Sequence, residues 1–236
     1  MKRVILIWLI GMCSSALPAQ IDSVKTTIKY SGPGFTKSQL IPLGLISAGA
    51  LLNIGTIKNN IQDIIPDTRT RIDDYLQYIP IAQLYLYDGL GYKHQNSLFT
   101  QTKYLAISHL ISGFWVQVLK TTTQVKRPVG GNTSYPSGHT TNAFVNAAVL
   151  YHEFKDTDPW LAYGGFALST ATGILRMTND AHWLPDVLTG AGIGILTVNL
   201  VYFVEPFKSF QPFKKKRDLT LFPMISPYSA GILCRF

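Results

Sequence analysis

Apolar segments of helical length follow one another between residues 40 and 204, separated by short polar or turn-rich stretches. Strand-like alternation of apolar and polar residues is scarce before Leu219. The pattern therefore predicts an all-α, antiparallel bundle of about five to six core helices. The predicted helical segments are Leu40 to Ile57, Asp74 to Leu90, Tyr104 to Lys120, Thr141 to Phe154, Trp160 to Arg176 and Asp186 to Val204.

Two parts of this pattern differ from an ordinary core helix. Residues 74–90 are interrupted by Pro80 and crowded with tyrosines, which favours a helix lying at an interface over one that crosses a bilayer. Residues 206–236 form a tail whose last part alternates weakly, so we expect a short irregular or hairpin structure there. The sequence ends in Phe236, and outer-membrane barrels also often end in phenylalanine. This tail has room for too few strands to form a barrel.

The first 20 residues have the order of a secretory signal, with a basic start, an apolar run and then small and polar residues. We expect a signal peptide over 1–19 and a single domain over 20–236, with its catalytic core at about 100–205. The alternative is an uncleaved membrane anchor. Lipid attachment at Cys13 is disfavoured because Met12 is bulky. Cleavage would leave Cys234 without a disulfide partner, so packing has to provide the stability.

Composition favours membrane association. Charged residues make up 14% and apolar ones 47%, a balance too apolar for an ordinary soluble enzyme and too polar for a chain made only of membrane helices. The net charge is +8, and part of it lies in the run 214–217. Behind an apolar helix, such a run is more typical of a membrane flank than of a nucleic-acid site, so we expect no nucleic-acid partner.

The order of the apolar segments also predicts an orientation. If residue 20 starts outside the cytoplasm and 74–90 does not span, the remaining segments place residues 214–217 inside, as the positive-inside rule prefers. We therefore expect an exported protein of the cell envelope, associated with the inner membrane, whose active site faces the periplasm. A soluble periplasmic bundle is the alternative, since 141–154 is short for a span.

Three blocks of polar residues stand at the ends of these helices. The blocks are Lys120-x6-Arg127-Pro128, Pro136-Ser137-Gly138-His139 and Arg176-x5-His182-x3-Asp186. An antiparallel bundle brings all three to one end, because consecutive helices run alternately toward that end and away from it.

The residue types in these blocks suit a phosphate group. Lys120, Arg127 and Arg176 would neutralise the phosphate dianion and the further charge of the transition state. Ser137 and Gly138 stand where a loop enters a helix, and a helix N-terminus attracts anions. The preceding stretch, 130–134, is glycine-rich and is expected to form a flexible lid.

Two histidines can carry the reaction. Asp186, four positions after His182, can hold one imidazole nitrogen and leave the other facing phosphorus, which makes His182 the candidate nucleophile. His139 is then available to protonate the leaving oxygen and later to activate water. Zinc bound by His139, His182 and Asp186 is disfavoured because the surrounding cations would repel the metal.

These blocks resemble the signature of the type-2 phosphatidic-acid phosphatase superfamily, which includes bacterial acid phosphatases and vanadium haloperoxidases. The resemblance covers Lys120 to Asp186 closely. It implies a helical core, catalysis without a metal or other cofactor, a phosphohistidine on His182 and acid–base work by His139. One departure is visible, since Leu175 stands where the family usually has serine, so one phosphate hydrogen bond is absent from the expected set.

The substrate expected from this reading is a lipid phosphate or pyrophosphate, such as phosphatidate, a polyprenyl pyrophosphate or lipid A. The alternatives are a vanadate-dependent haloperoxidase, a soluble periplasmic acid phosphatase and a non-catalytic binder of anionic lipids. The sequence does not indicate the oligomeric state.

Other polar residues are read as structural. Asp73 and Asp74 are adjacent, and adjacent positions on a helix point apart, which favours a solvated helix start. His94, His109 and His152 are expected to be hydrogen-bonded residues of the bundle.

Overall fold

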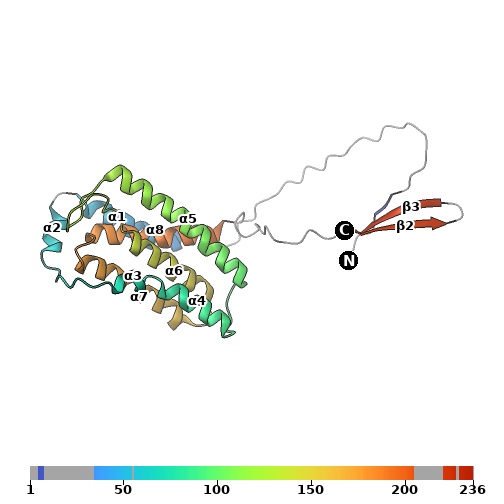
Figure 1. The fold of residues 1–236 in the computed structure, drawn as a ribbon, viewed down its shortest axis with the longest axis horizontal. Coiled ribbons are helices and arrows are strands. Elements are labelled where there is room, and N and C mark those ends of the chain that lie inside the picture. Colours follow the sequence, from blue (N-terminus) through green and yellow to red (C-terminus); the bar gives the residue numbers. More distant parts are fainter. Residues whose placement is uncertain (1–4, 8–34, 55, 205–219, 227–228, 236) are drawn as a thin grey trace. The chain divides into compact units, whose positions relative to one another are not determined.

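A computed structural model describes residues 5–7, 35–54, 56–204, 220–226 and 229–235. Residues 31–209 form one unit and residues 1–30 with 210–236 another, and each is described by itself. The described part of the first unit consists of helices (Figure 1). They are α1 (Phe35–Leu52), α2 (Ile57–Gln62), α3 (Ile72–Leu76), α4 (Ile79–Gly89), α5 (Leu98–Thr123), α6 (Gly138–Phe154), α7 (Pro159–Thr178) and α8 (Leu184–Phe203).

The predicted all-α bundle is confirmed, with two local differences. The segment expected over 74–90 forms two helices, and Pro80 lies in the first turn of α4, where its missing N–H leaves no helical hydrogen bond unmade. The short helix α2 lies in a stretch that the sequence pattern leaves as a loop.

Helix α6 lies at the centre of the bundle and packs against α5, α7 and α8 (Figure 1). Most of its side chains are buried, and they contribute largely to one apolar core. The fully buried members of this core include Leu84, Val145, Val149, Leu150, Phe154 and Val198. Because α6 is fixed on several sides, the residues at its start have a defined position relative to the ends of α7 and α8.

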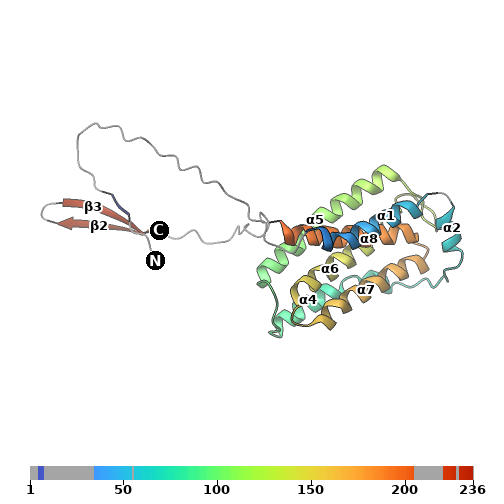
Figure 2. The same cartoon turned by 180° about the vertical axis from the view of Figure 1, so that it is seen from behind.

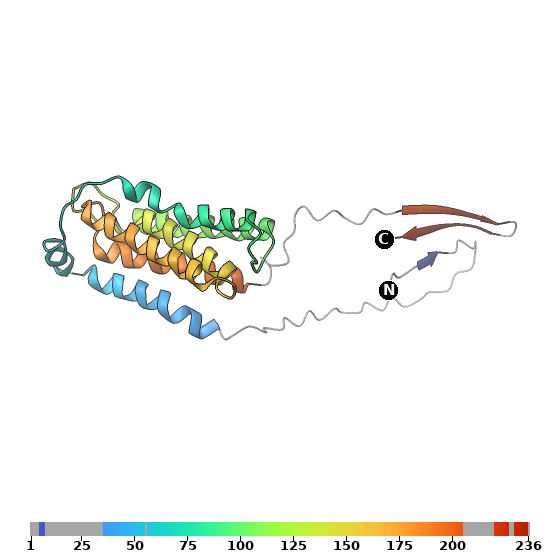
Figure 3. The same cartoon turned by 90° about the horizontal axis from the view of Figure 1, so that it is seen from below.

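Glycines allow the first turns of α8 to pack closely on both sides. A Cβ atom added at Gly49 in α1 would lie 2.7 Å from the carbonyl oxygen of Pro185. A Cβ at Gly190 in α8 would lie 2.7 Å from the carbonyl oxygen of Ser137. Helix α1 runs along α8, as Figures 2 and 3 show. These contacts hold the start of α8 between α1 and the start of α6.

The outer surface of the bundle carries large apolar side chains. Leu110, Phe114 and Trp115 on α5 are exposed, and Trp160 at the start of α7 is 90% exposed. Among the described residues, one helix, α8, is long and apolar enough to cross a membrane. About two thirds of its apolar stretch is buried inside the bundle.

In the second unit, β1 (Ile5–Ile7), β2 (Thr220–Ser226) and β3 (Ser229–Arg235) form an antiparallel sheet in the order β1-β3-β2. The hairpin expected in the C-terminal tail is therefore confirmed, with β2 and β3 antiparallel and Ser226 paired to Ser229. Apart from β1, the predicted signal peptide lies outside the described residues, and so does the basic run 214–217. The signal peptide and the single domain over 20–236 stay predictions.

Candidate active site

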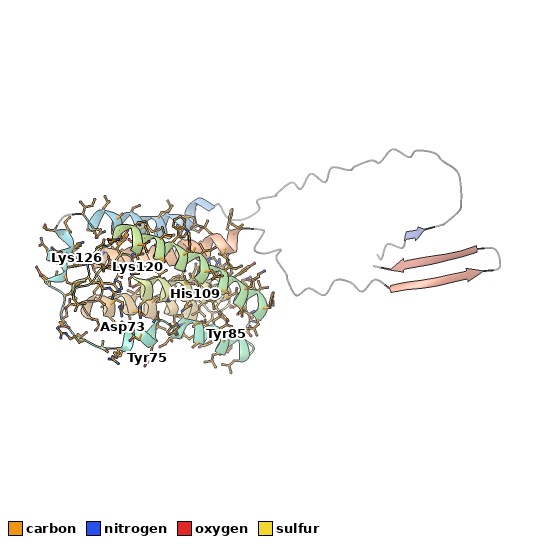
Figure 4. All side chains as sticks on the ribbon, turned by 45° about the horizontal axis from the view of Figure 1, so that its top comes forward. Asp73, Tyr75, Tyr85, His109, Lys120 and Lys126 are labelled. Carbon is orange, nitrogen blue, oxygen red and sulfur yellow. The ribbon has the colours of Figure 1, made fainter. Side chains whose placement is uncertain are left out.

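The structure brings the three polar blocks to one end of the bundle. Lys120 lies in the last turn of α5 and Arg176 in the last turn of α7, whereas His139 and Asp186 lie in the first turns of α6 and α8. Figure 4 shows Asp73, Lys120 and Lys126 toward this end and Tyr85 toward the other.

His182 and Asp186 form a buried pair in the connection from α7 to α8. The His182 side chain is 2% exposed, and its Nδ1 lies 3.3 Å from Asp186 Oδ2. The same carboxylate oxygen accepts a hydrogen bond from the backbone N–H of Trp183 at 3.0 Å. No described residue is hydrogen-bonded to His182 Nε2, so this pair holds the ring through one nitrogen and leaves the other available for chemistry.

Ser134 is a member of the site that the sequence analysis did not single out. Its hydroxyl donates a short hydrogen bond to Asp186 Oδ2 and lies 3.4 Å from His182 Nδ1. Its carbonyl oxygen, together with that of Thr133, accepts hydrogen bonds from Lys120 Nζ at 3.2 and 2.7 Å. Ser134 therefore connects the lysine of the first block with the histidine of the third.

The stretch 130–134, where a flexible lid is expected, forms a hydrogen-bonded turn in the structure. The backbone N–H of Ser134 donates to Val125 O at 2.8 Å, and Gly131 O accepts from Arg127 N at 3.1 Å. Gly130 and Gly131 have φ values of 97° and 85°, which a tight turn uses and which side chains disfavour. The glycines serve a hydrogen-bonded turn that fixes Ser134.

Arg176 is paired with Asp73, which lies in the short helix α3. Arg176 Nη1 is 2.5 Å from Asp73 Oδ2, and the two side chains are only 11% and 2% exposed. Asn179 Nδ2 donates to the other oxygen of Asp73 at 2.9 Å. The solvated helix start expected for Asp73 is therefore wrong, because α3 packs against the end of α7.

His139 contacts Asp74, the acid that follows Asp73 in the sequence. Its Nε2 lies 3.0 Å from Asp74 Oδ1, and that same oxygen is 3.9 Å from Arg176 Nη1. Both carboxylates thus approach Arg176 Nη1, although the two positions are adjacent in α3, and Asp74 also contacts His139. Both acids reach residues of the site, since α3 contacts α6 and α7.

Ser137 and Gly138 form the entry to α6. Ser137 is fully buried as the helix N-cap, and its hydroxyl oxygen accepts hydrogen bonds from the backbone N–H and the hydroxyl of Thr140. Its own N–H donates to Asp186 O at 3.0 Å, which joins the second block to the third. A Cβ at Gly138 would meet nothing within 4 Å, so this glycine borders open space.

The surroundings lower the pKa of both histidines. Burial lowers the pKa of His182 to about 4, and the charges of Lys120 and Arg176 add to this effect, whereas Asp186 opposes it. The pKa of His139 is also lowered, by burial and by Arg176, against the opposing effects of Asp74 and Asp73. A neutral His182 keeps the lone pair that a nucleophile requires.

The remaining described histidines are hydrogen-bonded, as expected. His109 Nε2 and His152 Nε2 each lie 2.9 Å from an asparagine Oδ1. His94 contacts Asn96 O through Nδ1 and Asp88 through Nε2. None of these three lies beside the cations of the site.

Fold and site together define a class: an α-helical bundle with cations and two histidine–carboxylate pairs at one end. The sequence matches the PAP2 superfamily over residues 40–209, and the chain belongs to this family. The resemblance inferred from the three blocks is thus confirmed.

The chain is similar to lipid A 1-phosphatases of two bacteria. It is 31% identical to that of Porphyromonas gingivalis over 223 residues, which cover 89% of this chain and 47% of the relative. It is 36% identical to that of Helicobacter pylori over 84 residues, covering 35% of this chain and 41% of the relative. The matched residues thus cover less than half the length of each of these relatives.

The fold is also similar to the crystal structure of a transmembrane PAP2-type phosphatidylglycerolphosphate phosphatase from Bacillus subtilis. The TM-score is 0.50 at 18% sequence identity, covering 72% of this chain and 99% of that one. This likeness concerns the fold alone.

Proposed function

We propose that the protein is a phosphatase that hydrolyses a lipid phosphate or pyrophosphate through a phosphohistidine on His182. The observation that carries this proposal is the buried pair of His182 and Asp186, with the charges of Lys120 and Arg176 acting on it. A neutral imidazole beside cations combines a nucleophile with stabilisation of the charge on a phosphoryl group.

In the first step, the Nε2 lone pair of His182 attacks phosphorus, and the bond from phosphorus to the lipid oxygen breaks. Asp186 holds Nδ1 and stabilises the positive charge that develops on the ring. The leaving oxygen takes a proton from His139. Lys120, Arg127 and Arg176 bind the phosphoryl oxygens, and Arg176 Nε supports this role because it is buried with no hydrogen-bond partner among the described residues.

In the second step, water attacks the phosphohistidine. His139, now neutral, takes a proton from the water, the nitrogen–phosphorus bond breaks, and inorganic phosphate leaves. His182 returns to its neutral form and His139 to its acid form. No proton has to be supplied from outside the site during the cycle.

An apolar groove beside the site and the similarity to lipid phosphatases both support a lipid substrate. An apolar groove of about 670 Å³ is lined by α1, α6, α7 and α8, and its lining includes Met177 and Leu184, which flank the catalytic connection between α7 and α8. Acyl chains can pack there while the phosphate enters the site. Because the two relatives are lipid A 1-phosphatases, lipid A 1-phosphate is the first substrate to test.

The same proposal includes the location. We infer that the protein is exported and sits at the membrane, with the catalytic end of the bundle facing the periplasm. The exposed apolar side chains of α5 and α7 support contact with lipid.

The test is phosphate release by the purified full chain from lipid A, phosphatidate and a polyprenyl pyrophosphate, with His182→Ala beside the parent. The parent is expected to release phosphate and the variant to lose at least about a thousand-fold in rate. His109→Ala is a matched control, because His109 lies mid-bundle and contacts Asn146 (Figure 4).

Three outcomes would contradict the proposal. Hydrolysis unchanged in His182→Ala would exclude this nucleophile, and lipid binding without hydrolysis by the parent would favour a non-catalytic binder. Halide oxidation by the vanadate-loaded protein, without phosphatase activity, would favour a haloperoxidase. Acid-labile labelling of the parent by ³²P-substrate, absent from His182→Ala, would support the phosphohistidine directly.

A further inference from the structure

The segment before α3 is hydrogen-bonded to the end of α7 through Thr68 and Thr70. Thr68 N donates to Thr178 O at 2.9 Å, and the two threonine hydroxyls lie 3.0 Å apart. Asn179 Oδ1 accepts from Thr70 N at 2.7 Å, while its Nδ2 donates to Thr70 O at 2.8 Å. We call residues 67–74 the acidic strap, because they carry Asp67, Asp73 and Asp74 across the catalytic end of the bundle.

The two acids at the end of the acidic strap have different surroundings. Asp73 is buried between Arg176 and Asn179, so both of its oxygens have structural partners. Asp74 is 47% exposed in its side chain, and its contacts are His139 at 3.0 Å and the more distant Arg176 at 3.9 Å. Packing therefore accounts for Asp73 but leaves the contact of Asp74 with His139 without a purely structural explanation.

The charges around His139 come from two packed elements. Helix α3 presents Asp73 and Asp74, and α7 presents Arg176. Arg176 disfavours the imidazolium form of His139, whereas the two carboxylates favour it. Because Asp73 is already paired with Arg176, Asp74 is the acid in hydrogen-bond contact with the ring.

We propose that Asp74 is a positioning residue that orients His139 and stabilises its imidazolium form, so that the site contains two histidine–carboxylate pairs with opposite tasks. This proposal rests on the proposed role of His139 as general acid. Asp186 orients the ring that attacks phosphorus, and Asp74 orients the ring that delivers a proton to the leaving oxygen. Nε2–H of His139 donates to Asp74, and Nδ1 carries the proton that is transferred.

The test compares Asp74→Asn with the parent on a lipid phosphate and on p-nitrophenyl phosphate. The alkoxide or sugar oxygen of a lipid phosphate requires a proton as it leaves, whereas p-nitrophenolate leaves without one. We expect kcat/KM for the lipid phosphate to fall at least about ten-fold and kcat/KM for p-nitrophenyl phosphate to change less than about three-fold. The ratio kcat/KM reports only the steps up to the first product, so hydrolysis of the phosphohistidine does not obscure the comparison.

The pH profile on the lipid phosphate gives a second readout. Removing the charge of Asp74 lowers the pKa of His139, so the alkaline limb of kcat/KM should move to lower pH in Asp74→Asn. Asp74→Glu, which keeps the charge, should recover part of the lost rate. Asp67→Asn is the matched control, because Asp67 belongs to the same strap and pairs with the exposed Arg69.

The possible results separate this proposal from the proposed function. Equal losses on both substrates, or an alkaline limb that does not move, would show that Asp74 acts through structure alone and would overturn the inference. Asp73→Asn is expected to lower kcat/KM for both substrates, since it disturbs Arg176, which is proposed to bind phosphate. If the parent hydrolyses neither substrate, the proposed function itself fails.

Discussion

Arg176 and Asp73 are 103 positions apart in the sequence, and their side chains meet at 2.5 Å with almost no exposure to solvent. This pair joins the last turn of α7 to the short helix α3. It holds an arginine of the candidate phosphate site through one nitrogen while the Nε of the same side chain stays unbonded among the described residues. Asp73 thus fixes the direction of Arg176 without using all of its donors.

Removal of Asp73 should destabilise the fold. Asp73→Ala leaves the buried guanidinium of Arg176 without its partner and removes an acceptor of Asn179, so we expect a loss of about 3 kcal/mol in the free energy of unfolding. Thermal unfolding of the purified protein measures this loss. Asp67→Ala, which breaks an exposed pair with Arg69, should cost less than about 1 kcal/mol. Equal melting temperatures for the two variants would contradict a buried pair at Arg176.

The activity should persist into acid. The attacking form of His182 is neutral, and burial lowers its pKa to about 4, so protonation removes the nucleophile only when the pH falls toward that value. We therefore expect kcat/KM for a lipid phosphate to show an acid limb near pH 4, well below the ordinary histidine value. Initial rates across a pH series, in buffers of constant ionic strength, measure this limb. An acid limb well above pH 4 that does not follow the ionisation of the substrate phosphate, whose second pKa is about 6, would mean that His182 is solvated in the working enzyme.

Ser134 should matter for rate more than for binding. Ser134→Ala removes a short hydrogen bond to Asp186 and the contact with His182 Nδ1, which loosens the orientation of the ring. A hydrogen bond to a charged group is worth about 2 kcal/mol, so we expect kcat to fall roughly thirty-fold with little change in KM. Ser112→Ala in α5 is the control, because Ser112 is equally buried and its hydroxyl donates a hydrogen bond to His109 O, away from His182 and Asp186. A larger effect on KM than on kcat would place Ser134 in substrate binding instead.

Close packing at Gly190 should be needed for the alignment of two blocks. In Gly190→Ala, the new methyl group would lie 2.7 Å from Ser137 O and 3.0 Å from Thr141 Oγ1, and the backbone oxygen has no freedom to move away. We expect a loss of about 2 kcal/mol in the free energy of unfolding, together with lower activity, since α8 carries Asp186.

Gly113→Ala is the matched control for that substitution. Gly113 is also in a helix, but a Cβ there would meet nothing within 4 Å. Alanine is the better helix former, so this variant should gain up to about 1 kcal/mol. Thermal unfolding measures the change in melting temperature of Gly190→Ala and of Gly113→Ala. Similar shifts of the two melting temperatures would contradict the close approach of α8 to α6.

The helices of the bundle, and the end of the bundle at which the polar blocks meet, follow from local patterns along the chain. Helical periodicity is a local property, and consecutive helices of an antiparallel bundle run in opposite directions. Lys120, His139, Arg176 and Asp186 stand at successive helix ends. Their positions along the chain are therefore enough to predict that they lie at one end of the bundle.

The contacts of Asp73, Asp74 and Ser134 depend on how the helices pack in the folded bundle. Two adjacent acids in a short polar segment have the pattern of a solvated helix start, and a serine in a glycine-rich stretch has that of a mobile loop. What changes both readings is the packing of α3 across the ends of α6 and α7, and the hydrogen bonds that fix Ser134 beside Asp186. These contacts join residues distant in the chain, and no local spacing or periodicity encodes them.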